Sequence, residues 1–127
     1  MIRGGVRVVV TGGRDYADRD AVFSFLDALM SSYRVTSVAC GDADGCDSLV
    51  RDWCRERRVT SVVFFADWRK HGVGAGPIRN GRMLSDYRPD VVVAFPGGSG
   101  TSDCVVQARD RGVSVTMVGV DGELSVS

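Results

Sequence analysis

The chain has 127 residues, of which 44% are hydrophobic and 25% charged, a composition that fits one packed globular domain and excludes a disordered or fibrous chain. Its 16 basic and 16 acidic side chains cancel and are interspersed, so no basic field would attract duplex nucleic acid or an anionic membrane. No apolar run is long enough to span a membrane, and no signal segment opens the chain. We expect a single domain over residues 1–127 that works in the cytoplasm.

The cysteines and the histidine are too few and too scattered for a zinc centre. The cysteines stand at positions 40, 46, 54 and 104 without a C-x-x-C pair, and His71 is the single histidine. Structural zinc sites take four such ligands, in pairs at short spacing. We therefore expect reduced thiols and no metal site of this kind.

Short apolar, β-branched runs alternate with amphipathic stretches, a pattern typical of βαβ units around a parallel sheet. The runs are almost continuously hydrophobic, as expected of strands that helices cover on both faces. Five strands are predicted, at residues 6–11, 35–40, 60–65, 90–95 and 114–120. Right-handed crossovers favour the strand order 3-2-1-4-5. The predicted fold class is α/β, a single Rossmann-like three-layer sandwich with a parallel five-stranded sheet.

Four helices are predicted between the strands. The first begins after Asp18, a good N-cap, and ends near Ser32, with an inward-facing stripe that finishes at Tyr33. The second spans residues 45–58 and places Asp47 mostly on its outer face.

The second half of the chain holds the other two helices and two irregular segments. A helix over residues 77–87 has proline in its first turn, and a helix over residues 101–111 stops at a glycine. The connection over residues 66–76 is long for a strand-to-helix loop, which is typical of functional or mobile segments. The C-terminal sequence DGELSVS is expected to fray.

Two glycine-rich loops, TGGRDY and PGGSGT, follow the first and fourth predicted strands. Ligands of open parallel sheets bind where the strand order reverses, which here is between these two strands. Glycine lets the backbone approach a ligand, and the helix that follows offers unpaired N–H groups and a partial positive charge to a phosphate. The alternative for PGGSGT is a tight strand-to-helix turn without a ligand. The expected ligand-binding residues in these loops are Thr11, Gly12, Gly13, Pro96, Gly97, Gly98, Ser99, Gly100 and Thr101.

A third loop, GDADGCD, follows the second predicted strand, and from it we expect Gly41 and Asp47 to contact the ligand. Together with Asp42 and Asp44, the Asp47 carboxylate raises magnesium as a cofactor. Aspartate also forms turns and caps helices, and that is the alternative. The sequence indicates no other cofactor.

Five further side chains are candidates for ligand contact. Arg14 and Asp15 could hold a phosphate and a ribose or base edge, unless they form a surface ion pair. Trp68 could stack on a purine or anchor its loop. Arg79 and Asn80 lie in the first turn of the third predicted helix, where Arg79 could close over an anionic ligand.

Four motifs occur in the order TGGRDY, GDADGCDSLVRDWC, ADWRKHGVGAGPIRNGRML and AFPGGSGTSD. Together they resemble the YspA-type, YpsA-related branch of the SLOG superfamily over nearly the whole chain. The resemblance implies a Rossmann-like sheet that binds nucleotides or nucleotide-derived ligands. It also implies a homodimer or higher oligomer, for which Met83, Leu84 and Tyr87 could form the surface.

The same superfamily includes the LONELY GUY phosphoribohydrolases, whose PGGxGTxxE motif and upstream arginine resemble residues 96–104 and Arg79 followed by Met83. Their glutamate, however, falls on Cys104. Cleavage of an N-glycosidic bond builds positive charge on the ribose, which a carboxylate stabilises and a neutral thiol does not. Asp103 is adjacent, but one helical residue turns a side chain by about 100°, so it would need a shifted ligand; otherwise it complements the helix N-terminus. The candidate catalytic residues are Asp103 and Arg79.

Three functions are therefore open. The leading hypothesis is binding of a nucleotide-derived small molecule, such as an ADP-ribose-type compound or a nucleoside monophosphate, for sensing or sequestration. The first alternative is an N-glycosidase or phosphoribohydrolase that acts on a nucleotide. The second is a partner-binding scaffold with a vestigial pocket.

Overall fold

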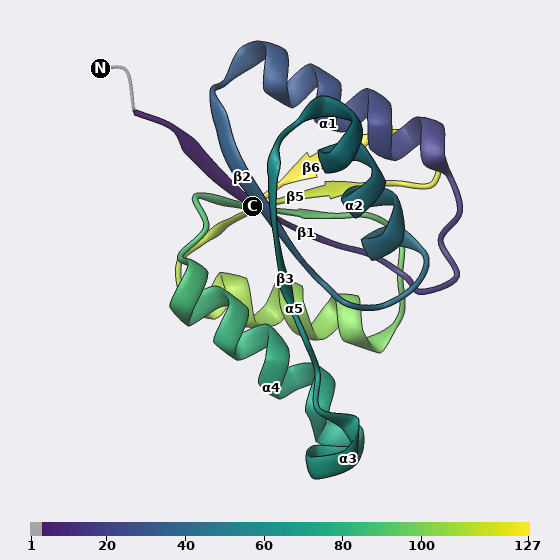
Figure 1. Ribbon diagram of the computed structural model, residues 1–127, viewed down its shortest axis with the longest axis vertical. Coiled ribbons are helices and arrows are strands. Elements are labelled where there is room, and N and C mark those ends of the chain that lie inside the picture. The colour runs from purple at the N-terminus through teal and green to yellow at the C-terminus, as the bar shows by residue number, and fades with distance from the viewer. Residues whose placement is uncertain (1–3) are drawn as a thin grey trace.

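The computed structural model describes residues 4–127, which form a six-stranded sheet between two layers of helices (Figure 1). The strands lie in the order β3-β2-β1-β4-β5-β6, and the first five run parallel. The predicted α/β class and the order 3-2-1-4-5 are confirmed, with one further strand at the edge. The strands are β1 (Val6–Thr11), β2 (Val35–Gly41), β3 (Thr60–Phe64), β4 (Val91–Ala94), β5 (Ser114–Val118) and β6 (Leu124–Val126).

The edge strand β6 forms where the sequence predicts a frayed tail. It runs antiparallel to β5, with Leu124 opposite Val118. Val115 and Ser127 extend the ladder by exchanging backbone hydrogen bonds of 3.0 and 2.9 Å. The prediction of fraying is wrong because the open edge of β5 offers N–H and C=O groups that the tail satisfies.

Helices cover both faces of the sheet (Figure 1). The helices α1 (Arg19–Ser32) and α2 (Cys46–Arg57) cover one face, and α4 (Ala75–Arg82) and α5 (Ser99–Asp110) cover the other. Because successive side chains of a strand point to opposite faces, Val8 packs in the cluster on the α1–α2 side and Val9 in the cluster on the α4–α5 side. Both are 0% exposed. This two-sided burial is the reason for the continuous apolar runs in the sequence.

The N-terminus of α1 forms as predicted. The Asp18 carboxylate accepts a hydrogen bond of 3.0 Å from the Ala21 N–H, and Val22 and Leu26 are buried. Tyr33, however, is 58% exposed, so the prediction that it closes the inner stripe is wrong. The chain leaves the helix at Tyr33, whose backbone is extended, and this turns the side chain away from the core.

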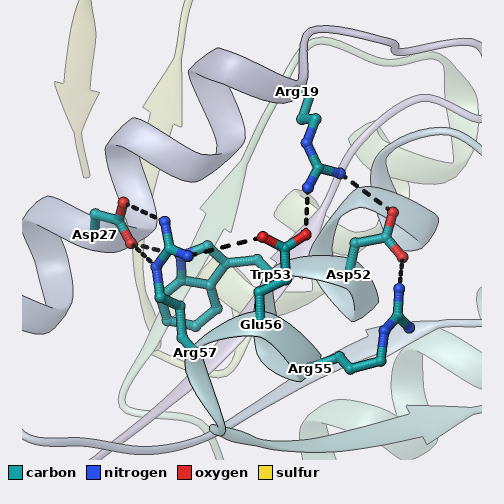
Figure 2. Close-up of polar contacts among 7 residues, drawn as sticks. All are labelled: Arg19, Asp27, Asp52, Trp53, Arg55, Glu56 and Arg57. Atoms are coloured by element: carbon teal, nitrogen blue, oxygen red, sulfur yellow. Dashed lines mark hydrogen bonds and ion pairs between the residues drawn. The ribbon is translucent and has the colours of Figure 1, made fainter.

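A polar network joins α1 to α2 (Figure 2). Asp27 of α1 accepts a hydrogen bond of 2.8 Å from the Trp53 indole and two, of 2.8 and 2.9 Å, from Arg57. Arg19, at the start of α1, forms an ion pair with Glu56 of α2. These contacts fix the two helices against each other on their outer side.

The segment after β3 is divided into short helical pieces, where the sequence predicts a loop and one helix. It contains α3 (Trp68–His71), a 3₁₀ turn over Gly72–Gly74, α4 and a π-helical turn over Met83–Tyr87. Asp67 caps α3 by accepting a hydrogen bond of 3.1 Å from the Lys70 N–H. Within residues 4–127 no helix is long and apolar enough to cross a membrane.

The side chains expected to form a dimer surface lie mostly inside the protein. Met83 and Leu84 are 2% and 3% exposed and pack with Val92 and Val105 of the core. Tyr87 is partly buried, and its hydroxyl lies 2.5 Å from that of Ser37. The expectation that these three side chains form a free surface is therefore wrong, because the π-helical turn directs them toward the sheet. The homodimer itself stays a prediction.

Candidate functional site

A cleft of about 920 Å³ lies at the carboxyl ends of β1, β2 and β4. Its walls come from the loops after these strands, together with α3, α4 and the first turn of α5. The strand order reverses between β1 and β4, which is where open parallel sheets place their ligands. The topology thus brings segments that are far apart in the sequence to one site.

The two glycine-rich loops contact each other. The Gly13 N–H donates to the Pro96 carbonyl at 2.9 Å, and the Gly13 carbonyl accepts from the Cys46 N–H at 3.0 Å. A Cβ on Gly97 would lie 2.7 Å from the Gly13 nitrogen, and a Cβ on Gly12 would lie 2.5 Å from the Cys46 sulfur. Glycine at positions 12 and 97 is therefore required by the packing of the protein itself.

Gly98 and Gly100 are different, since a Cβ at either position would meet no atom within 4 Å. They flank Ser99 at the start of α5, where Gly98 gives no side-chain cap. The first intrahelical bond runs from the Ser102 N–H to the Gly98 carbonyl at 3.0 Å. Among residues 4–127, nothing accepts a hydrogen bond from the N–H groups of Ser99, Gly100 and Thr101. These amides and the positive end of the α5 dipole offer donors and positive potential to an anion, and we refer to this turn as the candidate anion site.

Asp47 lies inside the protein, contrary to its predicted outward position on the second helix. It is 6% exposed and accepts a hydrogen bond of 3.1 Å from the Ala43 N–H. Burial raises the pKa of its carboxyl, and the Ala43 hydrogen bond and the nearby Arg79 and Arg51 cations oppose this rise. The sequence pattern missed the burial because the β2–α2 loop folds back over the first turn of α2.

The acidic loop after β2 does not form a magnesium cage. Asp42 forms an ion pair with Arg79 at 3.1 Å, and Asp47 accepts a hydrogen bond from the Ala43 N–H. In the described part of the chain, no group of three or more His, Cys, Asp or Glu side chains is arranged to hold a metal. The arrangement of donors gives the magnesium hypothesis no support.

Arg79 of α4 is fixed against the loop after β2. Its Nη1 donates to Asp42 at 3.1 Å and to the Phe64 carbonyl at 3.3 Å, and its Nε donates to the Asn80 side-chain oxygen at 3.0 Å. A Cβ on Gly41 would overlap the guanidinium, at 2.7 Å from its Cζ. Gly41 therefore makes the space in which Arg79 lies along the cleft.

Asn80 connects Arg79 to the anion site. Its amide nitrogen donates to the Gly100 carbonyl at 3.2 Å and to Asp103 at 3.0 Å, and its side chain is 3% exposed. Asp103 accepts a second bond, of 2.8 Å, from Gln107 on the same oxygen, Oδ2. These bonds hold α4 against the first turns of α5.

Arg14 and Trp68 face each other at the edge of the cleft. The Arg14 guanidinium carbon lies 5.8 Å from the centre of the Trp68 ring, and the Trp68 side chain is 47% exposed. Within residues 4–127, no ion pair joins Arg14 to Asp15. Trp68 is therefore only half buried, although a Cβ on Gly76 of α4 would lie 3.5 Å from its Cη2. Arg14 is not held by Asp15.

Every residue predicted from the sequence to bind the ligand or to act in catalysis lines this cleft, from Thr11 to Asp103. That they contact a ligand stays a prediction. Seven further residues line the cleft that were not expected to contact a ligand, although Met83 was noted for its spacing from Arg79. Tyr16 lies inside the TGGRDY motif, and glycine and proline mark the start of α4, but the apolar residues carry no local signal. The seven are Val10, Tyr16, Ala43, Val73, Gly76, Pro77 and Met83.

Comparison with known proteins identifies the family of this chain. The model of the YspA, cpYpsA-related SLOG family matches residues 6–71, just over half of the chain. This chain belongs to that SLOG family. The Gene 61 protein of Mycobacterium phage D29 is 36% identical over 121 residues, which cover 89% of this chain and 96% of the phage protein. Membership supports a Rossmann-like, nucleotide-related function and specifies neither a ligand nor an activity.

In this SLOG protein, Cys104 and Asp103 lie in different surroundings. Cys104 is 0% exposed and packs in the core on the inner face of α5, and burial raises the pKa of its thiol to about 12. It does not line the cleft, whereas Asp103 does. The only charged group at this turn of α5 is therefore Asp103, one residue before the position of the enzymes' glutamate.

Proposed function

We propose that this SLOG protein binds a nucleotide or nucleotide-derived ligand, such as a nucleoside monophosphate or an ADP-ribose-type compound, and that binding serves sensing or sequestration. The observation that carries the proposal is the first turn of α5. Three amides that have no acceptor among residues 4–127 lie beside two glycines that the protein's own packing does not require. We assign the phosphate to this turn.

The rest of the cleft supports a ligand larger than phosphate. Its volume of about 920 Å³ is in the range of sites for small molecules and cofactors. Thr11, Gly12 and Gly13 would lie against the ribose, since their loop contacts the anion site through the Gly13–Pro96 hydrogen bond. Arg79 adds positive charge along the cleft, although its Nη1 is already used by Asp42.

Gly100→Ala tests the anion site. Alanine suits a helix better than glycine, so the free energy of unfolding should rise by about 0.5–1 kcal/mol. The added methyl group would crowd a phosphate on the neighbouring amides, and affinity for AMP should fall about tenfold, whereas affinity for adenosine should not change. Calorimetric titration and urea denaturation measure the two effects.

Ser102→Ala is the matched control, because Ser102 is exposed on the same helix and does not line the cleft. It should leave AMP affinity unchanged. Equal losses for AMP and adenosine in Gly100→Ala would show that the phosphate does not lie on this turn. Gly100→Ala is preferred to Arg79→Ala, which would also remove the hydrogen bonds of Arg79 to Asp42 and to the Asn80 side-chain oxygen.

An N-glycosidase is the second candidate, and the position of Asp103 favours it. Its Oδ2 is used by Asn80 and Gln107, but Oδ1 has no partner among residues 4–127, and the side chain lines the cleft beside the anion site. That carboxylate could stabilise positive charge on a ribose.

One experiment separates the candidates. The protein is incubated with a pool of nucleotides, cyclic dinucleotides and ADP-ribose derivatives, and the bound and free fractions are analysed by mass spectrometry. An intact retained compound supports sensing or sequestration. Free base with ribose phosphate, lost in Asp103→Asn, supports the N-glycosidase. No retention and no turnover would contradict both and favour a scaffold with a vestigial pocket.

A further inference from the structure

A second, smaller pocket of about 150 Å³ opens beside the cleft. It is lined by Arg14, Asp42, Ala43, Asp44, Trp68 and Arg79. Four of these residues, Arg14, Ala43, Trp68 and Arg79, also line the main cleft, so the two spaces are continuous. The assignment of the phosphate to α5 leaves this side pocket without a role.

The side pocket lies at the distance that a nucleoside phosphate requires. The anion site follows β4, and the loop with Asp42 and Asp44 follows β2, with β1 between them. Neighbouring strands are about 4.8 Å apart, so the two sites are separated by roughly 10 Å. A phosphate alone cannot span this distance, whereas a ribose can place a base at one end and a phosphate at the other.

One wall of the side pocket is aromatic. Trp68 belongs to α3, which follows β3 and projects from the body of the protein (Figure 1), and its ring is about half exposed. Arg14 lies across from it, with its guanidinium carbon 5.8 Å from the ring centre. Stacked layers lie about 3.4 Å apart, so a base between the ring and the guanidinium needs a separation of about 6.8 Å. A base could therefore enter if Arg14 moves outward by about 1 Å. Arg14 has no hydrogen bond to any residue of 4–127 that would oppose this movement.

The loop after β2 adds hydrogen-bond acceptors to the lining of the side pocket. Asp44 is exposed and has no hydrogen bond or ion pair with any residue of the described chain. Asp42 uses Oδ1 for Arg79 and for the Ala66 N–H, which leaves Oδ2. Ionised carboxylates only accept hydrogen bonds. They therefore favour an amino group on the edge of a base and disfavour a carbonyl oxygen there.

We propose that the side pocket is a nucleobase subsite that selects bases with an exocyclic amino group, with Trp68 as the stacking surface and Asp44 as the acceptor. This inference rests on the proposed function, because it takes the phosphate to lie on α5. It narrows the ligand to amino-bearing nucleotides, such as those of adenine, and disfavours those of hypoxanthine.

The test compares AMP, IMP and ribose 5-phosphate. AMP carries an amino group at position 6 of the base, from which Asp44 would accept, whereas IMP carries a carbonyl oxygen there and keeps only its N1–H as a donor; ribose 5-phosphate lacks the base. AMP should bind about tenfold more tightly than IMP. Trp68 also reports stacking, since of the protein's two tryptophans Trp53 is fully buried. AMP should quench the tryptophan fluorescence, and ribose 5-phosphate should not.

Three variants and one control assign the roles. Asp44→Ala should reduce the ratio of AMP affinity to IMP affinity toward one. The control Asp110→Ala removes an exposed carboxylate at the far end of α5 and should leave this ratio unchanged. Trp68→Ala should lower the affinity for AMP about tenfold or more without changing the affinity for ribose 5-phosphate. Trp68→Phe keeps an aromatic surface, so it should retain most of the AMP affinity while losing the quenching.

The outcomes distinguish this inference from the proposed function. If AMP and ribose 5-phosphate bind but AMP has no advantage over IMP, or if Trp68→Ala weakens both ligands equally, the base subsite is wrong and the phosphate site stands. If none of the three compounds binds and no nucleotide of the mixed pool is retained, the proposed function fails, and the subsite fails with it.

Discussion

Asp47 shows how much a single residue depends on its surroundings in this protein. At 6% exposure, its carboxylate has one backbone hydrogen bond, from Ala43, and faces the guanidinium groups of Arg79 and Arg51. Arg51 in turn donates to the Gly41 and Ala43 carbonyls at 3.2 and 3.3 Å, so it holds the loop that carries the acid. Burial still dominates and raises the pKa of Asp47.

We expect the free energy of unfolding at pH 7 to be higher for Asp47→Asn than for the wild type. The raised folded-state pKa means that the ionised carboxylate destabilises the folded protein above that pKa, and the effect disappears as the pH falls toward the unfolded value of about 3.9. The advantage of the variant should therefore be smaller at pH 5. Urea denaturation at both pH values measures it.

Asp44→Asn is the control for this change, because Asp44 lies in the same loop but is exposed. It should show no such pH-dependent gain. A loss of stability in Asp47→Asn at pH 7 would mean that attraction to Arg79 and Arg51 outweighs the cost of burial.

At the scale of elements, polar contacts hold α1 against α2 on the outer side of the helical layer (Figure 2). Hydrogen bonds from Arg57, and then from Trp53, lower the pKa of Asp27. Trp53 is 0% exposed, so its indole N–H depends on Asp27 as its acceptor. The network therefore combines exposed ion pairs, which contribute little, with one buried donor that must be satisfied.

Asp27→Ala should lower the free energy of unfolding by about 1–3 kcal/mol at pH 7, because it leaves the buried indole N–H without a partner. Asp27→Asn keeps an acceptor oxygen and should cost less. The lowered pKa means that the charge of Asp27 stabilises the fold above about pH 3.9, and that this contribution is lost as the pH falls through the folded-state pKa. Urea denaturation at pH 7 and at pH 3 tests both statements, and equal costs of the two variants at pH 7 would show that the indole bond contributes nothing.

The turn between β2 and α2 depends on one glycine. Gly45 has φ of +66°, and a Cβ there would overlap the backbone of Arg14. The loop after β1 and the start of α2 can therefore approach each other only with glycine at this position. The same approach brings Arg14 to the edge of the cleft and places Cys46 beneath Gly12.

At the scale of the whole molecule, the protection of backbone amides against hydrogen exchange is expected to decrease from the centre of the sheet to its edge. Val8, Val9 and Val10 of β1 are 0% exposed, and their strand pairs on both sides. The residues of β6 are exposed, and the strand pairs on one side.

Hydrogen exchange should therefore be at least about 100-fold slower for the amides of β1 than for those of β6, because β1 opens only with global unfolding and β6 opens locally. Exchange followed by mass spectrometry or by nuclear magnetic resonance measures the difference. Equal protection of the two strands would mean that β6 belongs to the cooperative core.

The sequence by itself determined the α/β class, five strands with their order, and the position of the two glycine-rich loops at the reversal of strand order. These features follow from local hydrophobic patterns and from the handedness of βαβ connections, which does not depend on side-chain detail. The bounds of α1 were predictable for the same reason. So was the position of Thr11 and Thr101, at the two ends of the predicted glycine-rich loops, in the lining of the cleft.

Only the tertiary structure decided which polar groups are paired. The burial of Asp47, the Asp42–Arg79 ion pair, the use of Asp103 by Asn80 and Gln107, and the side pocket beside Trp68 all join residues from different segments of the chain. The strand β6 likewise exists because β5 leaves an open edge. A local pattern records which face of one element is apolar, but the partner of a polar group is set by packing between elements that the sequence places far apart.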